Sequence, residues 1–255
     1  MVSAVLHYRQ AKRLNRLAEG AARKHMLRQI PDRALREKLT PDYDFGCKRP
    51  TFSNNYFPTF NRDNVHLETT PIASIEPDGI VTTGGKKTEI DTLVLATGFN
   101  LWDVNFPAIE VIGREGRNLG KWWRENRFQA YQGVAVPYFP NFITLASPYS
   151  YSGLSYFTTI ESQMKHMSRL FTEVKKRKAA AFEVTQEAND KFLARMTKDL
   201  EDSVFALSSC QTSGSYYFNQ HGFNQHGEAA ILRPTSTINA FIEAGRIPLS
   251  HYDFK

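Results

Sequence analysis

Two adjacent cations, Lys48 and Arg49, are the strongest candidates for chemistry in this chain of 255 residues. A guanidinium group stays protonated at working pH and offers a planar fork of donors to an oxyanion. A lysine ammonium is a point charge that suits a phosphate. An exposed basic pair before Pro50 is the alternative interpretation. Only the neighbouring motifs can distinguish a functional cationic site from an exposed basic pair.

A second candidate follows the apolar residues 90–96, which predict a strand buried on both faces. This run ends at Thr97, Gly98 and Phe99. Small residues at the carboxyl end of a buried strand let the backbone approach a ligand, and open α/β sheets bind ligands at that edge. A tight turn from strand to loop explains the same residues.

Other motifs of catalysis and binding are missing from the sequence. The fifteen glycines include no pair separated by a single residue, so no dinucleotide fingerprint or glycine-rich phosphate loop can be drawn. No GxSxG, HExxH or CxxC pattern occurs, which leaves hydrolase and zinc-enzyme interpretations without support. His221 and His226 lie in a tandem FNQHG repeat, which favours a duplicated surface loop over a zinc site. We expect no metal.

Charge and composition bound the class of protein. The 41% apolar content supports a real core and excludes disorder. Residues 1–40 contain ten Lys/Arg and three Asp/Glu, while the rest of the chain is nearly neutral in spite of a net charge of +6. Their spacing predicts a helix that ends before Pro31. A solvated helix is favoured over a nucleic-acid-binding arm or an organelle presequence, so no nucleic-acid partner is expected.

The two cysteines, Cys47 and Cys210, lie far apart in a chain without a secretory signal. This arrangement predicts reduced thiols and a cytoplasmic location rather than a disulfide scaffold. No run approaches the ~18 apolar residues that a membrane span needs, so no such span is expected.

Periodicity places the remaining elements. Turn residues run to about residue 64, and strands are expected at 65–69, 72–75, 80–83 and 142–146. A long helix before the lysine cluster 175–178 and a second helix near 185–207 follow. We expect their apolar stripes to lie in the core, and these stripes comprise Ile160, Met164, Met167, Phe171 and Val174 on the first helix, and Phe192, Met196, Leu200 and Val204 on the second.

The order of these motifs resembles the C-terminal half of class B flavoprotein monooxygenases, and most of all the Baeyer-Villiger monooxygenases. The resemblance covers nearly the whole chain from about Ile30 onward. It is carried by residues 39–43 (LTPDY), 46–50 (GCKRP), 56–57 (YF), 64–65 (NV), 91–99 (DTLVLATGF), 133–134 (GV) and 139–142 (FPNF).

The resemblance implies an α/β fold in which two dinucleotide-binding domains are each incomplete. Residues 1–45 would be a basic helical segment of the NADPH domain. Residues 46–96 would end that domain with a buried strand leading to Ala96, Thr97 and Gly98. Residues 97–255 would be the C-terminal part of the FAD domain with substrate-pocket loops. The glycine fingerprints of the family belong upstream of these parts.

The resemblance also implies roles for residues. Arg49 matches the active-site arginine that holds the nicotinamide near the flavin and stabilises the negatively charged flavin peroxide. Lys48 matches a lysine that contacts the 2′-phosphate of NADPH. Further contacts to FAD or NADPH fall on Thr97, Gly98, Phe99 and Tyr216, and the substrate pocket falls on Ser152, Gly153, Leu154, Ser155 and Tyr156. Ser147 replaces a usual glycine and Tyr216 lies where relatives carry tryptophan, so this chain departs from the family there.

The implied function is oxygenation of a ketone, or of sulfur or nitrogen, with O2, FAD and NADPH. We expect the chain alone to be inactive and to bind FAD poorly, because the pyrophosphate-binding turn is absent. The alternative is a non-catalytic remnant, or a subunit that pairs with a separately encoded N-terminal half.

Overall fold

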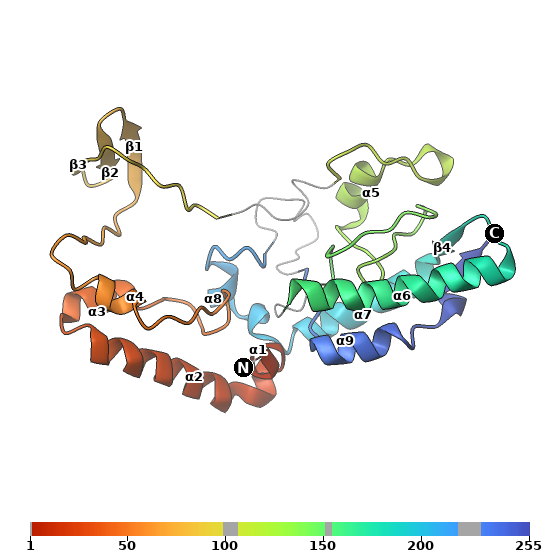
Figure 1. Ribbon diagram of the computed structural model, residues 1–255, viewed down its shortest axis with the longest axis horizontal. Coiled ribbons are helices and arrows are strands. Elements are labelled where there is room, and N and C mark those ends of the chain that lie inside the picture. The colour runs from red at the N-terminus through yellow and green to blue at the C-terminus, as the bar shows by residue number, and fades with distance from the viewer. Residues whose placement is uncertain (1, 99–106, 151–154, 219–230) are drawn as a thin grey trace. The chain divides into compact units, whose positions relative to one another are not determined.

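The computed structural model describes residues 2–98, 107–150, 155–218 and 231–255. The chain forms two compact units. The first unit contains residues 1–18, 43–50 and 100–255, and the second contains residues 19–42 and 51–99. Figure 1 shows the elements of both units by label.

Two long helices organise the first unit. Helix α6 (Tyr156–Arg177) and helix α7 (Gln186–Leu200) confirm the two helices that the spacing predicted. Ser155 and Thr185 cap their N-termini through side-chain oxygens. The second helix ends earlier than expected, and Val204 lies instead in a separate short 3-10 helix.

Shorter elements complete the first unit. Helix α9 (Thr237–Ala244) packs against α6, and strands β4 (Phe182–Val184) and β5 (Tyr252–Phe254) pair antiparallel. These elements are α1 (Val2–Leu6), η2 (Arg114–Gly116), α5 (Leu119–Asn126), β4 (Phe182–Val184), η3 (Val204–Ala206), α8 (Ser208–Gln211), α9 (Thr237–Ala244), η5 (Leu249–His251) and β5 (Tyr252–Phe254). The largest side chains with almost no exposure include Trp123, Tyr131, Leu170 and Met196.

The buried face of α6 is more polar than the sequence predicted. Met164 and Phe171 were expected in the core, but they are 47% and 50% exposed. That part of the prediction is wrong because polar side chains occupy the face that turns inward. The buried residues of α6 are Thr159, Ser162, Gln163, His166, Met167 and Leu170.

Two of these polar side chains hold neighbouring segments. Gln163 accepts a hydrogen bond from the backbone N–H of Ala146 at 2.9 Å and donates one to the carbonyl of Gly133. His166 Nε2 forms a 2.7 Å hydrogen bond with the Tyr252 hydroxyl of β5. Burial, aided by the nearby charge of Arg169, lowers the pKa of His166 to about 3. The ring is therefore neutral at pH 7, which suits its buried position.

A three-stranded antiparallel sheet forms the main β element of the second unit. Its order is β1 (Ile72–Glu76), β2 (Gly79–Thr82) and β3 (Lys87–Glu89). Ile75 lies opposite Ile80 in the register. The strands predicted at 72–75 and 80–83 are confirmed, but residues 65–69 form no strand and β3 was not expected.

The apolar run after β3 does not form the predicted buried strand. Residues 90–96 have no strand structure, and Leu93, Val94 and Leu95 are 40%, 81% and 73% exposed. A strand buried on both faces needs neighbours that satisfy its backbone groups. No sheet of the described residues includes this run, so the prediction is wrong here. The strand predicted at 142–146 is reduced to one isolated bridge between Ala135 and Ile143.

The basic N-terminal helix is confirmed. Helix α2 (Tyr8–Gln29) contributes residues to both units and ends before Pro31. Its lysines and arginines are exposed, as a solvated helix predicts. Two helices that the sequence did not predict, α3 (Arg33–Leu39) and α4 (Tyr56–Thr59), lie in the second unit. None of the described helices is long and apolar enough to span a membrane.

Because the pKa of the buried His166 is lowered, we expect the free energy of unfolding to depend on pH. The folded pKa of about 3 lies below the ordinary value of 6.5, so the unfolded chain binds more protons between these two pH values. The free energy of unfolding of the wild type should therefore fall as the pH drops from 7 to 5. His166→Gln should lose that component in urea unfolding followed by circular dichroism. The exposed His66→Gln serves as control and should follow the wild type. Equal slopes for wild type and His166→Gln would contradict this account.

Candidate functional site

The loop that carries Lys48 and Arg49 is held by a backbone hydrogen bond of its own and by contacts with Asn15 and Val5. The N–H of Cys47 donates to the carbonyl of Asp44 at 3.1 Å, and the side-chain amide of Asn15 donates to the carbonyl of Phe45 at 3.0 Å. Gly46 adopts a φ of +103°, and a Cβ there would lie 2.7 Å from a methyl group of Val5. A larger residue would meet both backbone strain and a clash.

A disulfide between Cys47 and Cys210 joins this loop to α8. Both residues are fully buried, and their Cα atoms lie 4.8 Å apart, within the range for such bonds. Beside the disulfide, the Ser209 hydroxyl donates to the carboxylate of Asp44 at 2.6 Å. Two links therefore hold the loop against α8.

The disulfide overturns one expectation from the sequence. Reduced thiols were expected because 163 residues separate Cys47 from Cys210. That prediction is wrong, since the fold places α8 beside the loop. No signal in the sequence marked the pairing, because the distance along the chain says nothing about the distance in space. The cysteines thus no longer support a cytoplasmic location, which stays a prediction.

Lys48 and Arg49 follow the disulfide directly. The ammonium of Lys48 lies 4.9 Å from the centroid of the Tyr43 ring, which is a cation–π distance. Arg49 is exposed. The disulfide therefore holds the backbone beside the predicted pair. A guanidinium group can bind an anion through its planar fork of donors.

Tyr216 belongs to the loop that follows α8. Its ring centroid lies 4.7 Å from that of Tyr217, which is buried and packs against Phe205. Tyr216 itself is 36% exposed. Tyr216 is six positions after Cys210 in the sequence, and six residues span at most ~20 Å. The disulfide therefore limits how far Tyr216 can lie from the Lys48–Arg49 loop.

The other predicted site residues belong to different units of the chain. Ser155 caps α6, where it accepts a hydrogen bond from the N–H of Thr158, and Tyr156 is 54% exposed. Thr97 and Gly98 belong to the second unit, where they are exposed and follow no strand. The remaining predicted residues, Phe99, Ser152, Gly153 and Leu154, lie outside the described residues.

Among the described residues, no group of three or more His, Cys, Asp or Glu side chains is arranged to hold a metal ion. The histidines of the tandem repeat, His221 and His226, lie outside those residues.

Comparison with curated proteins relates this chain to flavin enzymes. No protein-family model matches it. A Baeyer-Villiger monooxygenase of Pseudomonas aeruginosa is 32% identical over 209 residues, which cover 82% of this chain and 39% of that protein. A Baeyer-Villiger monooxygenase of Streptomyces coelicolor is 29% identical over 236 residues, which cover 92% and 44%. The chain is a homologue of the C-terminal part of Baeyer-Villiger monooxygenases.

Solved structures agree with this relationship. An oxidized steroid monooxygenase bound to NADP is 28% identical with a TM-score of 0.79, and the match covers 94% of this homologue and 45% of that chain. Cyclohexanone monooxygenase from Rhodococcus sp. Phi1 bound to NADP+ is 26% identical with a TM-score of 0.80 and the same coverage. The predicted α/β class and family resemblance are confirmed.

The relationship extends over only part of these enzymes. This Baeyer-Villiger homologue spans about two fifths of the length of the curated relatives it matches, between 39% and 41% for the first of them. The roles of its site residues are therefore matters for proposal.

We expect a variant without the Cys47–Cys210 disulfide to be less stable than the wild type. A bond that closes a loop of this length restricts the unfolded chain, so Cys210→Ser should lower the free energy of unfolding by about 2–5 kcal/mol. Guanidinium unfolding without reductant measures this loss. Hydrogen exchange at residues 43–50 should rise in the same variant. Ser208→Ala, an exposed change on α8, is the control. A Cys210→Ser variant as stable as the control would rule out the bond.

Proposed function

We propose that this homologue supplies the C-terminal part of an FAD- and NADPH-dependent monooxygenase of the Baeyer-Villiger type. Its substrate would be a ketone, or a compound oxygenated at sulfur or nitrogen, together with O2. The observation that carries the proposal is the 32% identity with a Baeyer-Villiger monooxygenase over 82% of this chain. The assignment of residues 1–45 and 46–96 to the NADPH domain, and of 97–255 to the FAD domain, belongs to the same proposal.

Arg49 is the residue on which the chemistry would depend. Arg49 is an exposed residue on a loop held by the Cys47–Cys210 disulfide, so the loop backbone needs little reorganisation when an anion binds. Preorganised donors of this kind stabilise negative charge that develops during a reaction. Bound FAD would supply the oxygen chemistry. Arg49 would orient the nicotinamide and stabilise negative charge.

Lys48 would distinguish the phosphorylated nicotinamide cofactor. Its ammonium is a compact charge 4.9 Å from the Tyr43 ring, which limits where the side chain can reach. An ammonium held near a fixed loop suits the 2′-phosphate of NADPH. The two neighbouring cations would therefore bind different parts of one cofactor.

The residues that bind the pyrophosphate of a dinucleotide would come from an N-terminal half. The sequence contains no pair of glycines separated by one residue, and such pairs form the usual phosphate-binding turn. The exposed run at Leu93, Val94 and Leu95 supports the same proposal, because it has the composition of a central strand. It would pair with strands of that half.

The second candidate is a non-catalytic subunit or remnant. The exposed apolar run at 93–95 favours it as well, since an uncovered strand-like segment tends to associate with other chains. The two candidates differ in whether cofactors bind once an N-terminal half is present.

Co-expression separates these candidates. This chain, produced with the N-terminal half of the Pseudomonas aeruginosa relative, should give yellow protein that oxidises NADPH. Arg49→Ala should lower the rate about 100- to 1,000-fold while FAD remains bound. The control is Arg62→Ala, an exposed arginine outside the loop, which should keep the wild-type rate. Colourless protein, or Arg49→Ala as active as Arg62→Ala, would contradict the catalytic proposal.

A further inference from the structure

The loop of residues 144–150 comes shortly before Ser155 and Tyr156, which are assigned above to the substrate pocket. Two of its residues, Ala146 and Tyr149, have φ values of +49° and +57°. Residues other than glycine rarely adopt this left-handed region, and such a backbone persists only where the surrounding structure holds it. The loop therefore depends on contacts with the rest of the first unit.

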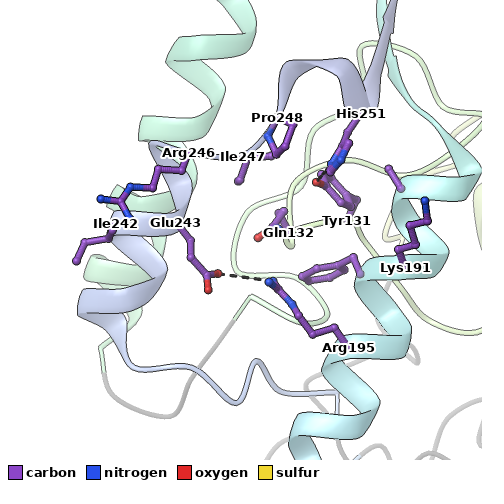
Figure 2. A pocket seen from close by; sticks show the side chains of 12 residues that line it. Tyr131, Gln132, Lys191, Arg195, Ile242, Glu243, Arg246, Ile247, Pro248 and His251 are labelled. Atoms are coloured by element: carbon purple, nitrogen blue, oxygen red, sulfur yellow. Dashed lines mark hydrogen bonds and ion pairs between the residues drawn. The ribbon is translucent and has the colours of Figure 1, made fainter.

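A tight turn at Gln132 and Gly133 provides the group to which this loop is held. The two residues have φ values of +55° and +67°. Before the turn, the hydroxyl of the buried Tyr131 forms a 2.5 Å hydrogen bond with Nδ1 of His251. Figure 2 shows these two side chains together in the wall of a pocket of about 360 Å³. A Cβ at Gly133 would collide with Ser150, so glycine lets the loop pack directly against the turn.

Gln163 of α6 joins the turn and the loop through the two ends of its amide. The nitrogen donates to the carbonyl of Gly133, and the oxygen accepts from the N–H of Ala146 at 2.9 Å. Gln163 is only 4% exposed, so water competes little for these bonds. One of the two bonds acts on Ala146 itself, where the backbone has a positive φ. A single side chain therefore holds both segments to the helix.

Hydroxyl groups of the loop reach the same carbonyl. Thr144 donates to the hydroxyl oxygen of Ser147 at 2.7 Å, and Ser147 donates to the carbonyl of Gly133 at 2.8 Å. The hydroxyl of Ser150 donates to the carbonyl of Ser147 at 2.6 Å. These side chains bond within the protein, so they hold the loop in one conformation.

The end of the loop lies against the first turns of α6. Ser150, Thr159 and Gln163 line the same small cavity. Thr159 is buried, and its hydroxyl donates to the carbonyl of Ser155 at 3.0 Å. Ser155 is the N-cap of this helix, and Tyr156 is its first residue. The contacts of Gln163 therefore lie next to the described end of the assigned substrate pocket.

We propose that Gln163 is a positioning residue for the substrate pocket. Its two hydrogen bonds set the backbone of residues 144–150, and this loop sets the position from which the chain continues to Ser155 and Tyr156. Gln163 acts through the loop and touches neither substrate nor cofactor. The inference rests on the proposed oxygenase function, because it names a residue on which binding of the ketone depends. Preorganised supporting contacts of this kind keep a binding site in its productive geometry.

Hydrogen exchange of the full chain tests whether Gln163 holds the loop. Gln163→Met keeps the length of the side chain and removes both hydrogen bonds. Amides of residues 144–150 should exchange about tenfold faster in this variant, as expected when a hydrogen bond that closes a local opening is lost. Ser168→Met places the same side chain at an exposed position of α6 and should exchange like the wild type. Equal exchange in the two variants would overturn the proposal.

Steady-state kinetics of the assembly with the N-terminal half of the Pseudomonas aeruginosa relative test the effect on the ketone. With cyclohexanone as the probe, Gln163→Met should raise KM about tenfold and change kcat and the FAD content less than about twofold. A variant that merely folds poorly would lower kcat, because less enzyme is active, and would leave KM unchanged. Gln163→Glu keeps an acceptor for the N–H of Ala146 and should give an intermediate KM.

The outcomes separate this inference from the function on which it rests. A wild-type assembly that oxidises NADPH and oxygenates cyclohexanone, with the same KM in Gln163→Met as in Ser168→Met, would overturn the role of Gln163 alone. A colourless wild-type assembly, or one that oxidises no NADPH, would overturn the proposed function and the role in ketone binding with it.

Discussion

The covalent bond between Cys47 and Cys210 is the constraint on which the candidate site depends. It joins a short loop near the start of the chain to α8, 163 residues later. The hydrogen bond from Ser209 to Asp44 and the packing of Gly46 against Val5 act on the same loop. A loop held in this way presents its cations at a defined position, and this is what binding of an anionic cofactor requires.

Buried polar groups play the corresponding role in the rest of the first unit. Gln163 and His166 replace apolar side chains on the inner face of α6, and each hydrogen-bonds a segment distant in sequence. Such contacts specify one arrangement of loops more sharply than apolar packing does, provided that each group has a partner. Not every such atom has a partner: Nδ1 of His166 and the side-chain oxygen of Gln132 have none among the described residues.

Local patterns in the sequence predicted local structure well. The apolar spacing of α6 and α7 predicted the observed helices, and the strands expected at 72–75 and 80–83 form the observed hairpin. Predictions that depended on distant residues failed. The composition of residues 90–96 predicted a buried strand, but a buried strand also needs neighbouring strands that pair with its backbone. The positions of Cys47 and Cys210 in the sequence did not indicate that they form a disulfide. The order of the motifs along the chain, from residues 39–43 to 139–142, identified the family, although the contacts between them could not be predicted.

Two features support the candidate site: the homology with Baeyer-Villiger monooxygenases and the disulfide that holds the cationic loop. The disulfide is the more direct to test. Trypsin cleaves around Cys47 to release residues 39–48, and around Cys210 to release residues 199–246, because Pro234 protects Arg233. Mass spectrometry of a non-reduced digest should find these two peptides linked, and reduction should separate them. Recovery of both peptides with alkylated free thiols, without prior reduction, would contradict the account.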